Sequence, residues 1–291
     1  MSSTIELIKN VYRKVVPKRL KFYREVVRYR YLSDKYLKKL DVENGLPLFE
    51  YIEIETLNRC NGKCTFCPVN VNQPQRPYAK MTEELFKKII QELESYHYDG
   101  YINLFSNNEP YLDERILDWM KYTKKHLPDA KLIMYTNGSV LTMEKFLETI
   151  QFTYYLHIDN YSDDDTVNKN LKDIYIYIST HSELNGRVFF SMRKRDEKLT
   201  TRGGEAPNRR NAKGIRAVCL YPYKQMVIRP DGKCSLCCND ALGKYTLGDV
   251  SKQTLKEIWY GKEYMELRKE MKATYRTNLK LCKNCDTHNM I

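Results

Sequence analysis

Short apolar runs alternate with amphipathic stretches through the middle of this chain. Apolar runs of strand length predict β-strands at residues 49–56, 101–105, 131–135, 153–158 and 187–192. Between these runs, apolar residues recur at helical spacing and predict helices at residues 82–96, 113–126, 142–149 and 164–179. Alternation of this kind is typical of parallel β/α units, and we expect an α/β fold with a partial (β/α)6 TIM-like barrel.

The pattern changes on both sides of this series. Residues 1–47 are basic, carry apolar side chains at helical spacing and predict helices, two of them at residues 20–31 and 33–40. After about residue 205 the alternation ends, a Pro230-Asp231-Gly232 turn predicts a hairpin, and a helix is predicted over residues 254–272. We therefore expect an N-terminal helical extension at 1–47, the barrel at 48–205 and a small C-terminal domain at 206–291.

Composition narrows the class of protein. The chain has 291 residues, of which 42% are hydrophobic and 30% charged, and this balance is typical of a globular protein. It lacks a run of about 20 apolar residues and a secretory signal, so we expect a cytoplasmic protein. Lys and Arg number 49 against 37 Asp and Glu, and the net charge of +12 favours anionic partners. Phosphorylated substrates, nucleic acid and acidic lipid all remain open.

Nine cysteines without an export signal indicate thiolate chemistry rather than disulfides. Cys60, Cys64 and Cys67 follow the first predicted strand on one short loop. Three thiolates can hold three irons of a [4Fe–4S] cluster and leave the fourth iron without a protein ligand. A structural zinc site would need a fourth ligand, and the next thirty residues offer only His97. We therefore favour the open cluster.

This loop resembles that of the radical SAM superfamily. The resemblance lies in the C-x3-C-x2-C spacing, the aromatic residue before the last cysteine and the position after the first strand of a β/α series. It implies a [4Fe–4S] cluster that binds S-adenosylmethionine, and reductive cleavage of that molecule to a 5′-deoxyadenosyl radical. It also implies a reducing electron donor such as a flavodoxin or ferredoxin.

The resemblance extends to residues at the ends of later strands. It implies that Phe66 packs beside the adenine of S-adenosylmethionine and that other positions hold the rest of the molecule: Asn108, Glu109, Asn137, Asp159 and Arg193. Asn107-Asn108-Glu109-Pro110 aligns with the family's G-G-E-P segment, with both glycines replaced by asparagine. His157 stands where many members have a serine at the ribose contact.

A second group of cysteines lies in the last third of the chain: Cys219, Cys234, Cys237, Cys238, Cys282 and Cys285. In one assignment the two Cys-x2-Cys pairs form a zinc site. In the other, Cys219 replaces Cys234 and the four thiolates hold a second [4Fe–4S] cluster. The segment from Cys219 to Cys285 resembles the SPASM extension of radical SAM enzymes, or its shortened form called twitch, and this resemblance implies the auxiliary cluster.

Cys234 and Cys238 are then left over. They are either small buried packing residues or, in the case of Cys238, a catalytic hydrogen-atom donor. Adjacent residues on a strand point to opposite faces, so a cluster ligand at Cys237 would turn Cys238 away from the cluster.

These observations predict a radical SAM enzyme, an oxidoreductase or epimerase of a sugar, cyclitol or sugar-phosphate-like molecule. The basic run with Arg209, Arg210 and Lys213 would attract an anionic substrate. A peptide-modifying enzyme is the alternative, although residues 1–46 show no strands for a leader-binding module. A nucleic-acid-binding protein with structural metal sites is a distant third. The basic N-terminal helices would either dock on the protein or contact an acidic membrane surface peripherally.

Overall fold

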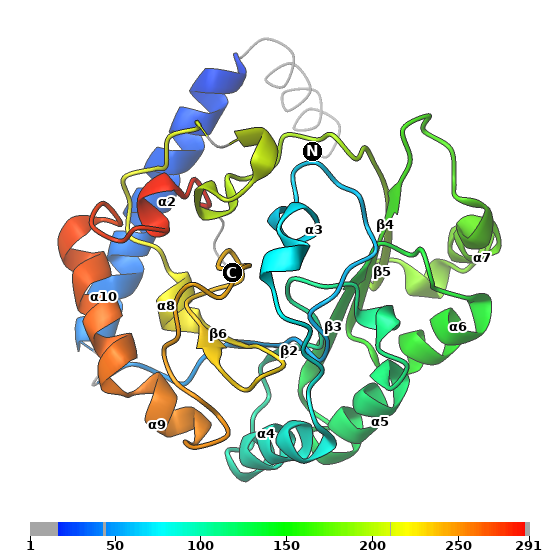
Figure 1. Ribbon diagram of the computed structural model, residues 1–291, viewed down its shortest axis with the longest axis horizontal. Helices are drawn as coiled ribbons and strands as arrows, with labels where there is room; N and C mark the ends of the chain where they lie inside the picture. Colours follow the sequence, from blue (N-terminus) through cyan, green and yellow to red (C-terminus); the bar gives the residue numbers. More distant parts are fainter. Residues whose placement is uncertain (1–16, 43–44, 210, 289–291) are drawn as a thin grey trace, which may run out of the picture.

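The computed structural model describes residues 17–42, 45–209 and 211–288 (Figure 1). The helix expected before residue 17 and the predicted role of Arg210 lie outside the described residues. The fold is α/β around one seven-stranded sheet with the strand order β5-β4-β3-β2-β1-β6-β7. The predicted fold class is therefore confirmed.

Six of the seven strands run parallel. The strands are β1 (Tyr51–Ile54), β2 (Tyr101–Asn103), β3 (Lys131–Thr136), β4 (Tyr155–Tyr161), β5 (Val188–Arg193), β6 (Gln225–Ile228) and β7 (Cys234–Ser235). The first five strands pair in parallel, in sequence order, close to the positions predicted. The sixth parallel strand, β6, comes from the C-terminal hairpin and pairs with β1, while β7 pairs antiparallel with β6.

Four amphipathic helices cover the outer side of the sheet and follow one another around it in Figure 1: α4 (Glu83–Ser95), α5 (Ile116–His126), α6 (Met143–Phe152) and α7 (Lys172–Thr180). The side chain of Thr82 caps α4 by accepting a hydrogen bond from the Leu85 amide at 3.2 Å. Alternate strand residues such as Ile52 and Ile54 are fully buried towards these helices. The intervening residues face the lumen of the partial barrel.

The basic N-terminal segment forms one helix, α2 (Lys18–Val42), where the sequence predicts two. Ser33, expected at the break, is buried and donates its hydroxyl to the Arg30 carbonyl at 2.9 Å, so the helix continues through it. Val26 and Tyr29 of α2 pack against Ile215 and Ala217. Of the two roles expected for this segment, the structure shows the one in which the helix docks on the rest of the protein.

The C-terminal part shares a core with the barrel. It contains α8 (Tyr221–Lys224), α9 (Leu255–Trp259) and α10 (Lys262–Thr274), the last two replacing the single helix predicted over 254–272. Trp259 is fully buried and donates its ring N–H to the Pro47 carbonyl at 2.9 Å. Because one apolar cluster includes both Ile52 and Trp259, the division into three domains stays a prediction.

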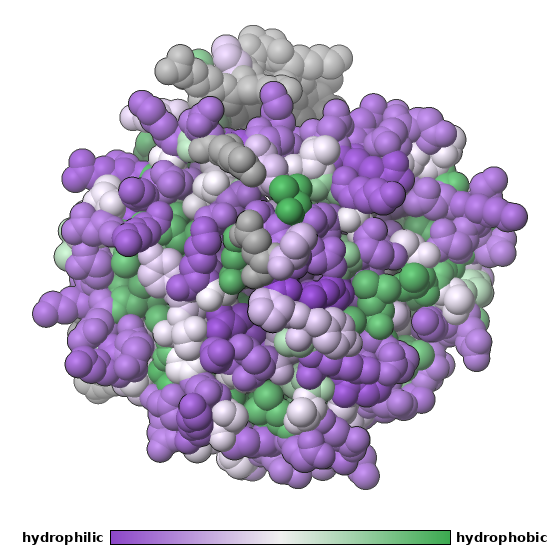
Figure 2. All heavy atoms as spheres, in the orientation of Figure 1, coloured by the Kyte–Doolittle hydropathy of each residue, from purple (hydrophilic) through white to green (hydrophobic). Residues whose placement is uncertain are grey.

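Short helices complete the chain. They are α3 (Pro68–Val71), η1 (Gln73–Gln75), η2 (Pro110–Leu112), η3 (Lys169–Leu171), η4 (Ser182–Leu184), η5 (Arg202–Gly204), η6 (Pro207–Arg209) and η7 (Cys282–Asn284). The visible face carries mostly hydrophilic residues, with hydrophobic ones in patches between them (Figure 2). Within the part of the chain that the structure describes, no helix is long and apolar enough to cross a membrane.

Candidate active site

The three cysteines of the first group lie together on the loop between β1 and α3. A tight turn forms within it, where the Cys67 amide donates to the Cys64 carbonyl at 3.1 Å. The pKa of Cys60 is raised to about 11 and that of Cys64 to about 12, mainly by burial and in smaller part by the neighbouring thiols of the loop. Bound iron would lower these pKa values and hold the three residues as thiolates, so the loop fits an iron cluster.

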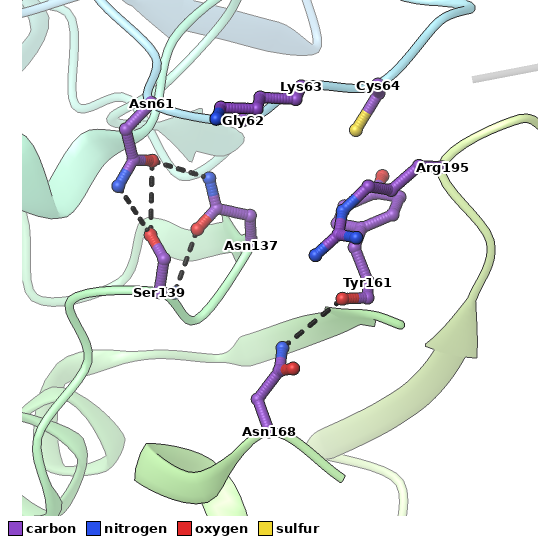
Figure 3. A pocket seen from close by; sticks show the side chains of 9 residues that line it. All are labelled: Asn61, Gly62, Lys63, Cys64, Asn137, Ser139, Tyr161, Asn168 and Arg195. Atoms are coloured by element: carbon purple, nitrogen blue, oxygen red, sulfur yellow. Dashed lines mark hydrogen bonds between the residues drawn. The ribbon is translucent and has the colours of Figure 1, made fainter. Parts of the chain in front are cut away.

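Asn137 joins this loop to the turn after β3 (Figure 3). Its side-chain amide donates to the Asn61 carbonyl oxygen at 3.0 Å and lies 3.8 Å from the Cys60 sulfur. The Asn61 amide donates in turn to the Ser139 hydroxyl at 2.8 Å. The predicted site residue Asn137 is therefore adjacent to the predicted cluster loop.

Glu109 holds Asn137 in place. Its carboxylate accepts hydrogen bonds from the Asn137 amide at 2.7 Å, the Thr136 hydroxyl at 2.7 Å and the Tyr111 amide at 3.2 Å. Burial raises the pKa of Glu109 to about 7, although these hydrogen bonds oppose the shift. The geometry makes Glu109 a positioning residue for the β3 turn, and its contact with S-adenosylmethionine stays a prediction.

The neighbouring asparagines have different partners. The Asn108 carbonyl oxygen accepts from the Ser106 amide at 3.0 Å, while its buried Nδ2 has no partner among the residues described. An unpaired buried donor of this kind is available to a ligand. Asn107 links the barrel to the C-terminal part, because its Nδ2 donates to the Cys238 carbonyl at 3.1 Å. Its Oδ1 accepts a hydrogen bond from Arg202.

Asp159 and His157 point to the same side of β4, towards the lumen. The His157 Nε2 lies 3.3 Å from the Asp159 carboxylate and 2.7 Å from the Ser191 hydroxyl of β5. A serine hydroxyl is therefore present beside Asp159, supplied by the neighbouring strand. Arg193 lies 3.9 Å from Asp159 and pairs with Glu197 at 2.7 Å. The predicted roles of Asp159 and Arg193 towards S-adenosylmethionine remain predictions.

A first cavity of about 350 Å³ opens between the cysteine loop and the ends of β3 and β4 (Figure 3). Its walls are Asn61, Gly62, Lys63, Cys64, Asn137, Ser139, Tyr161, Asn168 and Arg195. Sequence reasoning missed Tyr161 and Arg195. Strand alternation could have found Tyr161, since it follows Asp159 by two residues on the same strand. The Phe66 ring lies 6.0 Å from the Tyr161 ring, next to this cavity.

A second cavity, of about 400 Å³, lies in the barrel lumen. It is lined by Tyr51, Glu53, Tyr101, Asn103, Ile133, Tyr135, Tyr154, Tyr155, Tyr221, Gln225 and Cys238. Aromatic rings continue along this wall, where Tyr135 stacks on His157 with ring centres 4.9 Å apart and Tyr155 stacks on Phe189 at the same distance. We name this space the lumen cavity.

Glu53 is the acidic residue of the lumen cavity, and sequence reasoning missed it. Its side chain is 6% exposed, and one carboxylate oxygen accepts from the Gln225 amide at 2.8 Å. The other oxygen has no hydrogen-bond partner within the described ranges. Burial raises the pKa of Glu53 to about 7, against the opposing charge of Arg202. The alternation in Tyr51-Ile52-Glu53 was the signal that could have placed it in the lumen.

Four thiols of the second cysteine group line a third, apolar cavity, which we name the thiol cavity: those of Cys219, Cys237, Cys282 and Cys285. Gly203 of η5 borders it with φ +67°, and a Cβ at that position would lie 2.7 Å from the Leu281 side chain. Cys234 is buried elsewhere, near Arg229 and Asp249. The arrangement fits the four-thiolate cluster set with Cys219 and not the zinc set with Cys234.

Cys237 and Cys238 face different cavities. Cys237 lines the thiol cavity, whereas Cys238 lines the lumen cavity. Burial raises the pKa of the Cys238 thiol well above its ordinary value, and the charge of Glu53 raises it further. The thiol is therefore protonated at neutral pH and carries an S–H into the lumen. Its catalytic role stays a prediction.

Comparisons with known proteins agree with these sites. Residues 54–180 match the radical SAM superfamily, and residues 219–286 match the SPASM iron–sulfur cluster-binding domain. S-adenosyl-L-methionine-dependent 2-deoxy-scyllo-inosamine dehydrogenase of Niallia circulans is 28% identical over 239 residues, which cover 82% of this chain and 93% of that protein. The chain therefore belongs to the radical SAM superfamily and has a SPASM-type C-terminal domain.

Solved structures extend the comparison. The crystal structure of BtrN in complex with AdoMet and 2-DOIA matches with a TM-score of 0.70 and 25% identity, covering 83% of this chain and 94% of that one. AnSMEcpe with bound AdoMet matches with a TM-score of 0.53 and 14% identity over 83% and 86% of the two chains, and so shows the fold alone. The protein is a radical SAM enzyme.

The cofactors of this enzyme are S-adenosylmethionine and two iron–sulfur clusters, as the two matched domains imply. The cysteine loop and the thiol cavity offer donor sets that fit the clusters, and the unpaired Asn108 amide fits a polar ligand beside the loop. When bound, the first cluster and S-adenosylmethionine supply a carbon radical that abstracts a hydrogen atom. The electron donor stays a prediction.

Proposed function

We propose that this enzyme oxidises a secondary alcohol of a cyclitol- or sugar-like molecule to a ketone. The observation that carries the proposal is the lumen cavity, whose lining combines several tyrosine rings with the carboxyl of Glu53 and the amide of Gln225. Aromatic faces suit the C–H surface of a polyol ring, and a few polar groups orient its hydroxyls. The relative from Niallia circulans is named as a dehydrogenase of such a molecule.

The charge of the lumen cavity supports a neutral or amine-bearing polyol over the anionic substrate expected from the sequence. Among its described lining residues Glu53 is ionisable near neutral pH, and none is a lysine or arginine. Arg209, which was expected to attract an anion, pairs with Asp286 at 2.7 Å. Its guanidinium also donates to the Leu199 carbonyl.

Glu53 is the residue that we assign to proton transfer. Abstraction of the carbinol hydrogen leaves a carbon radical that still bears its hydroxyl. The carboxylate of Glu53 accepts the hydroxyl proton, because a base with a pKa near 7 is suited to transfer at neutral pH. With both cofactors bound, the oxidation would balance as one hydrogen atom to the deoxyadenosyl radical, one proton to Glu53 and one electron to an iron–sulfur cluster.

A panel assay tests the proposal. The reconstituted enzyme is incubated anaerobically with cyclitols, aminocyclitols, sugar phosphates and short peptides. Each compound carries deuterium on the carbon from which the hydrogen atom would be abstracted. We expect ketone from a neutral or amine-bearing polyol, in equal amount to 5′-deoxyadenosine, with deuterium transferred to the latter. Turnover only of a phosphate ester or a peptide would contradict it, and the peptide result would support the peptide-modifying alternative.

Epimerisation is the second candidate, favoured by the protonated Cys238 thiol on the lumen cavity. In that reaction the thiol returns a hydrogen atom to the substrate radical. If the enzyme is a dehydrogenase, we expect its Cys238→Ala variant to form ketone at close to the normal rate in deuterated buffer. For an epimerase, the same variant would lose solvent deuterium in the product while it still consumes S-adenosylmethionine.

A further inference from the structure

Arg276 is a buried arginine whose hydrogen bonds all go to uncharged groups. Its side chain is 1% exposed. The guanidinium donates to the carbonyls of Ala217 at 2.7 Å and Thr287 at 2.8 Å. A weaker contact, at 3.4 Å, reaches the hydroxyl of Tyr29 from α2. Across the described residues, no Asp or Glu forms an ion pair with it.

A buried cation without a counter-charge is strongly unfavourable, so a negative group must compensate it. The groups beside Arg276 that can become negative are the four cysteines of the thiol cavity, which its side chain borders, and they would be thiolates when they hold a cluster. The Arg276 guanidinium also lies 3.4 Å from the backbone carbonyl of Cys285, one of these four cysteines.

The backbone fixes the direction of this side chain. α10 ends at Thr274, and Tyr275 and Arg276 follow with φ values of +50° and +77°. Two successive residues other than glycine in the left-handed backbone region are conformationally unfavourable, and contacts with the surrounding residues must offset this cost. The turn sends the chain from α10 back under the thiol cavity, where the carbonyls of Ala217 and Thr287 hold the guanidinium.

We propose that Arg276 is the counter-charge of the auxiliary iron–sulfur cluster and raises its reduction potential. A cluster held by four thiolates is anionic, and reduction adds a further negative charge. A fixed positive charge in a medium of low dielectric constant stabilises the reduced form more than the oxidised form. Arg276 thereby makes the cluster a better electron acceptor, and this holds whether the enzyme is a dehydrogenase or an epimerase.

Potentiometry tests this role without a turnover assay. A variant with Cys60, Cys64 and Cys67 replaced by alanine keeps only the auxiliary cluster, whose reduction is followed by electron paramagnetic resonance in a redox titration. In this background we expect Arg276→Gln to lower the ratio of reduced to oxidised cluster at least tenfold at a fixed potential, a shift of 59 mV for a one-electron couple. The shift is towards more negative potential.

Arg268 provides a matched control. It is also buried, donates to the carbonyls of Pro222 at 2.8 Å and Trp259 at 2.6 Å, and lies over the Trp259 ring at 4.2 Å. It does not border the thiol cavity. We expect Arg268→Gln to shift the reduced-to-oxidised ratio less than threefold, although it also removes a buried charge from the same domain.

The Arg276→Lys variant keeps the charge and loses the carbonyl contacts. We therefore expect its ratio of reduced to oxidised cluster to stay within threefold of that of the protein with Arg276. An unchanged potential in Arg276→Gln would overturn the proposal. If Arg276→Gln binds no iron, the lysine variant decides alone. A tenfold loss in that variant would show that packing, and not charge, sets the potential, and would overturn the proposal as well.

Discussion

Glu53 and Glu109 are carboxyl groups that the fold buries, and this burial should appear in the pH dependence of stability. Burial raises the pKa of each to about 7 from an ordinary value near 4.5. When the pKa of a carboxyl is higher in the folded than in the unfolded protein, its contribution to stability is fully present below the unfolded pKa. That contribution is lost as the pH rises through the folded pKa. Both residues therefore oppose folding increasingly between about pH 4.5 and pH 7.

The Glu53→Gln variant tests this relation, because the glutamine oxygen can still accept the hydrogen bond from Gln225. Relative to the natural protein, we expect the variant to gain about 3 kcal/mol of stability between pH 4.5 and pH 8, since each pKa unit corresponds to about 1.4 kcal/mol. Thermal unfolding of the anaerobic, cluster-loaded proteins across this range measures it. A difference in Tm that does not change with pH would show that Glu53 is not held protonated.

For single residues, the sequence predicts which side chains belong to the candidate site better than it predicts which groups they contact. The spacing of Cys60, Cys64 and Cys67 identifies a loop that the structure keeps together, because the three residues are close along the chain. The choice between Cys219 and Cys234 could not be made from spacing, since it depends on which thiol the hairpin turns into the thiol cavity. Glu53 was missed because its chemistry arises from burial, which only the folded lumen creates.

Among the elements, η5 and η7 form the wall of the thiol cavity by direct contact. Gly203 of η5 lies against Leu281, and Gly204 lies against Asn284 of η7, both with positive φ. The hydroxyl of Thr201 donates to the Asn284 carbonyl at 2.7 Å. The segment that follows the barrel thus depends on the last cysteine pair for its conformation, and the pair depends on it.

Replacement of Gly203 by alanine should open this wall. The new Cβ would lie 2.7 Å from the Leu281 side chain, and the backbone at φ +67° disfavours any residue with a Cβ. We expect Gly203→Ala to lose most of the auxiliary cluster, which lowers iron from about eight to about four atoms per chain. Iron and sulfide quantitation after anaerobic reconstitution measures this.

Gly186 is the control for backbone strain alone. It has φ +80°, and nothing lies within 4 Å of a Cβ built there. Gly186→Ala should lower the unfolding temperature by a few degrees at most and keep about eight irons. Equal iron loss in the two variants would show that strain, and not contact with η7, explains the effect.

The elements themselves were predicted unevenly, for a physical reason. Hydrophobic periodicity located the first five strands and the first three helices between them, because each buries one face against its neighbours in sequence. The helix predicted over residues 164–179 is present only from Lys172 onwards, as α7. Periodicity could not show that β6 pairs with β1, because any strand of the right length satisfies the same local pattern. The predicted break in α2 was wrong, because the Ser33 hydroxyl donates its hydrogen bond to the Arg30 carbonyl within the same helix.

On the scale of the whole molecule, α2 has one face packed on the C-terminal part and another exposed. Val26 and Tyr29 are buried, whereas Leu20, Tyr23 and Tyr31 are exposed by more than half. Basic residues accompany the exposed apolar ones along the helix. Contact of this face with an acidic membrane surface stays a prediction, and the docked face does not exclude it.

Vesicle binding tests that contact in the full chain. We expect co-sedimentation with vesicles that contain anionic lipid at low ionic strength, and its loss at high ionic strength, because screening weakens attraction between exposed charges. Replacing Leu20 and Tyr23 by serine should reduce the bound fraction and leave iron content unchanged. Absence of binding at low ionic strength would leave α2 with its docking role alone.

The contact between Tyr29 and Arg276 joins residues 247 positions apart in the chain. Ribosomal synthesis completes α2 before its binding surface, because Ile215, Ala217 and Arg276 all follow it in the sequence. While the residues between them are synthesised, the apolar face of α2 therefore has no native partner, and the helix can dock only after the C-terminal part has been made. Docking of α2 is therefore coupled to the folding of the segment that carries the thiols, since the Tyr29 hydroxyl accepts hydrogen bonds from the Leu220 amide at 3.2 Å and from Arg276 at 3.4 Å.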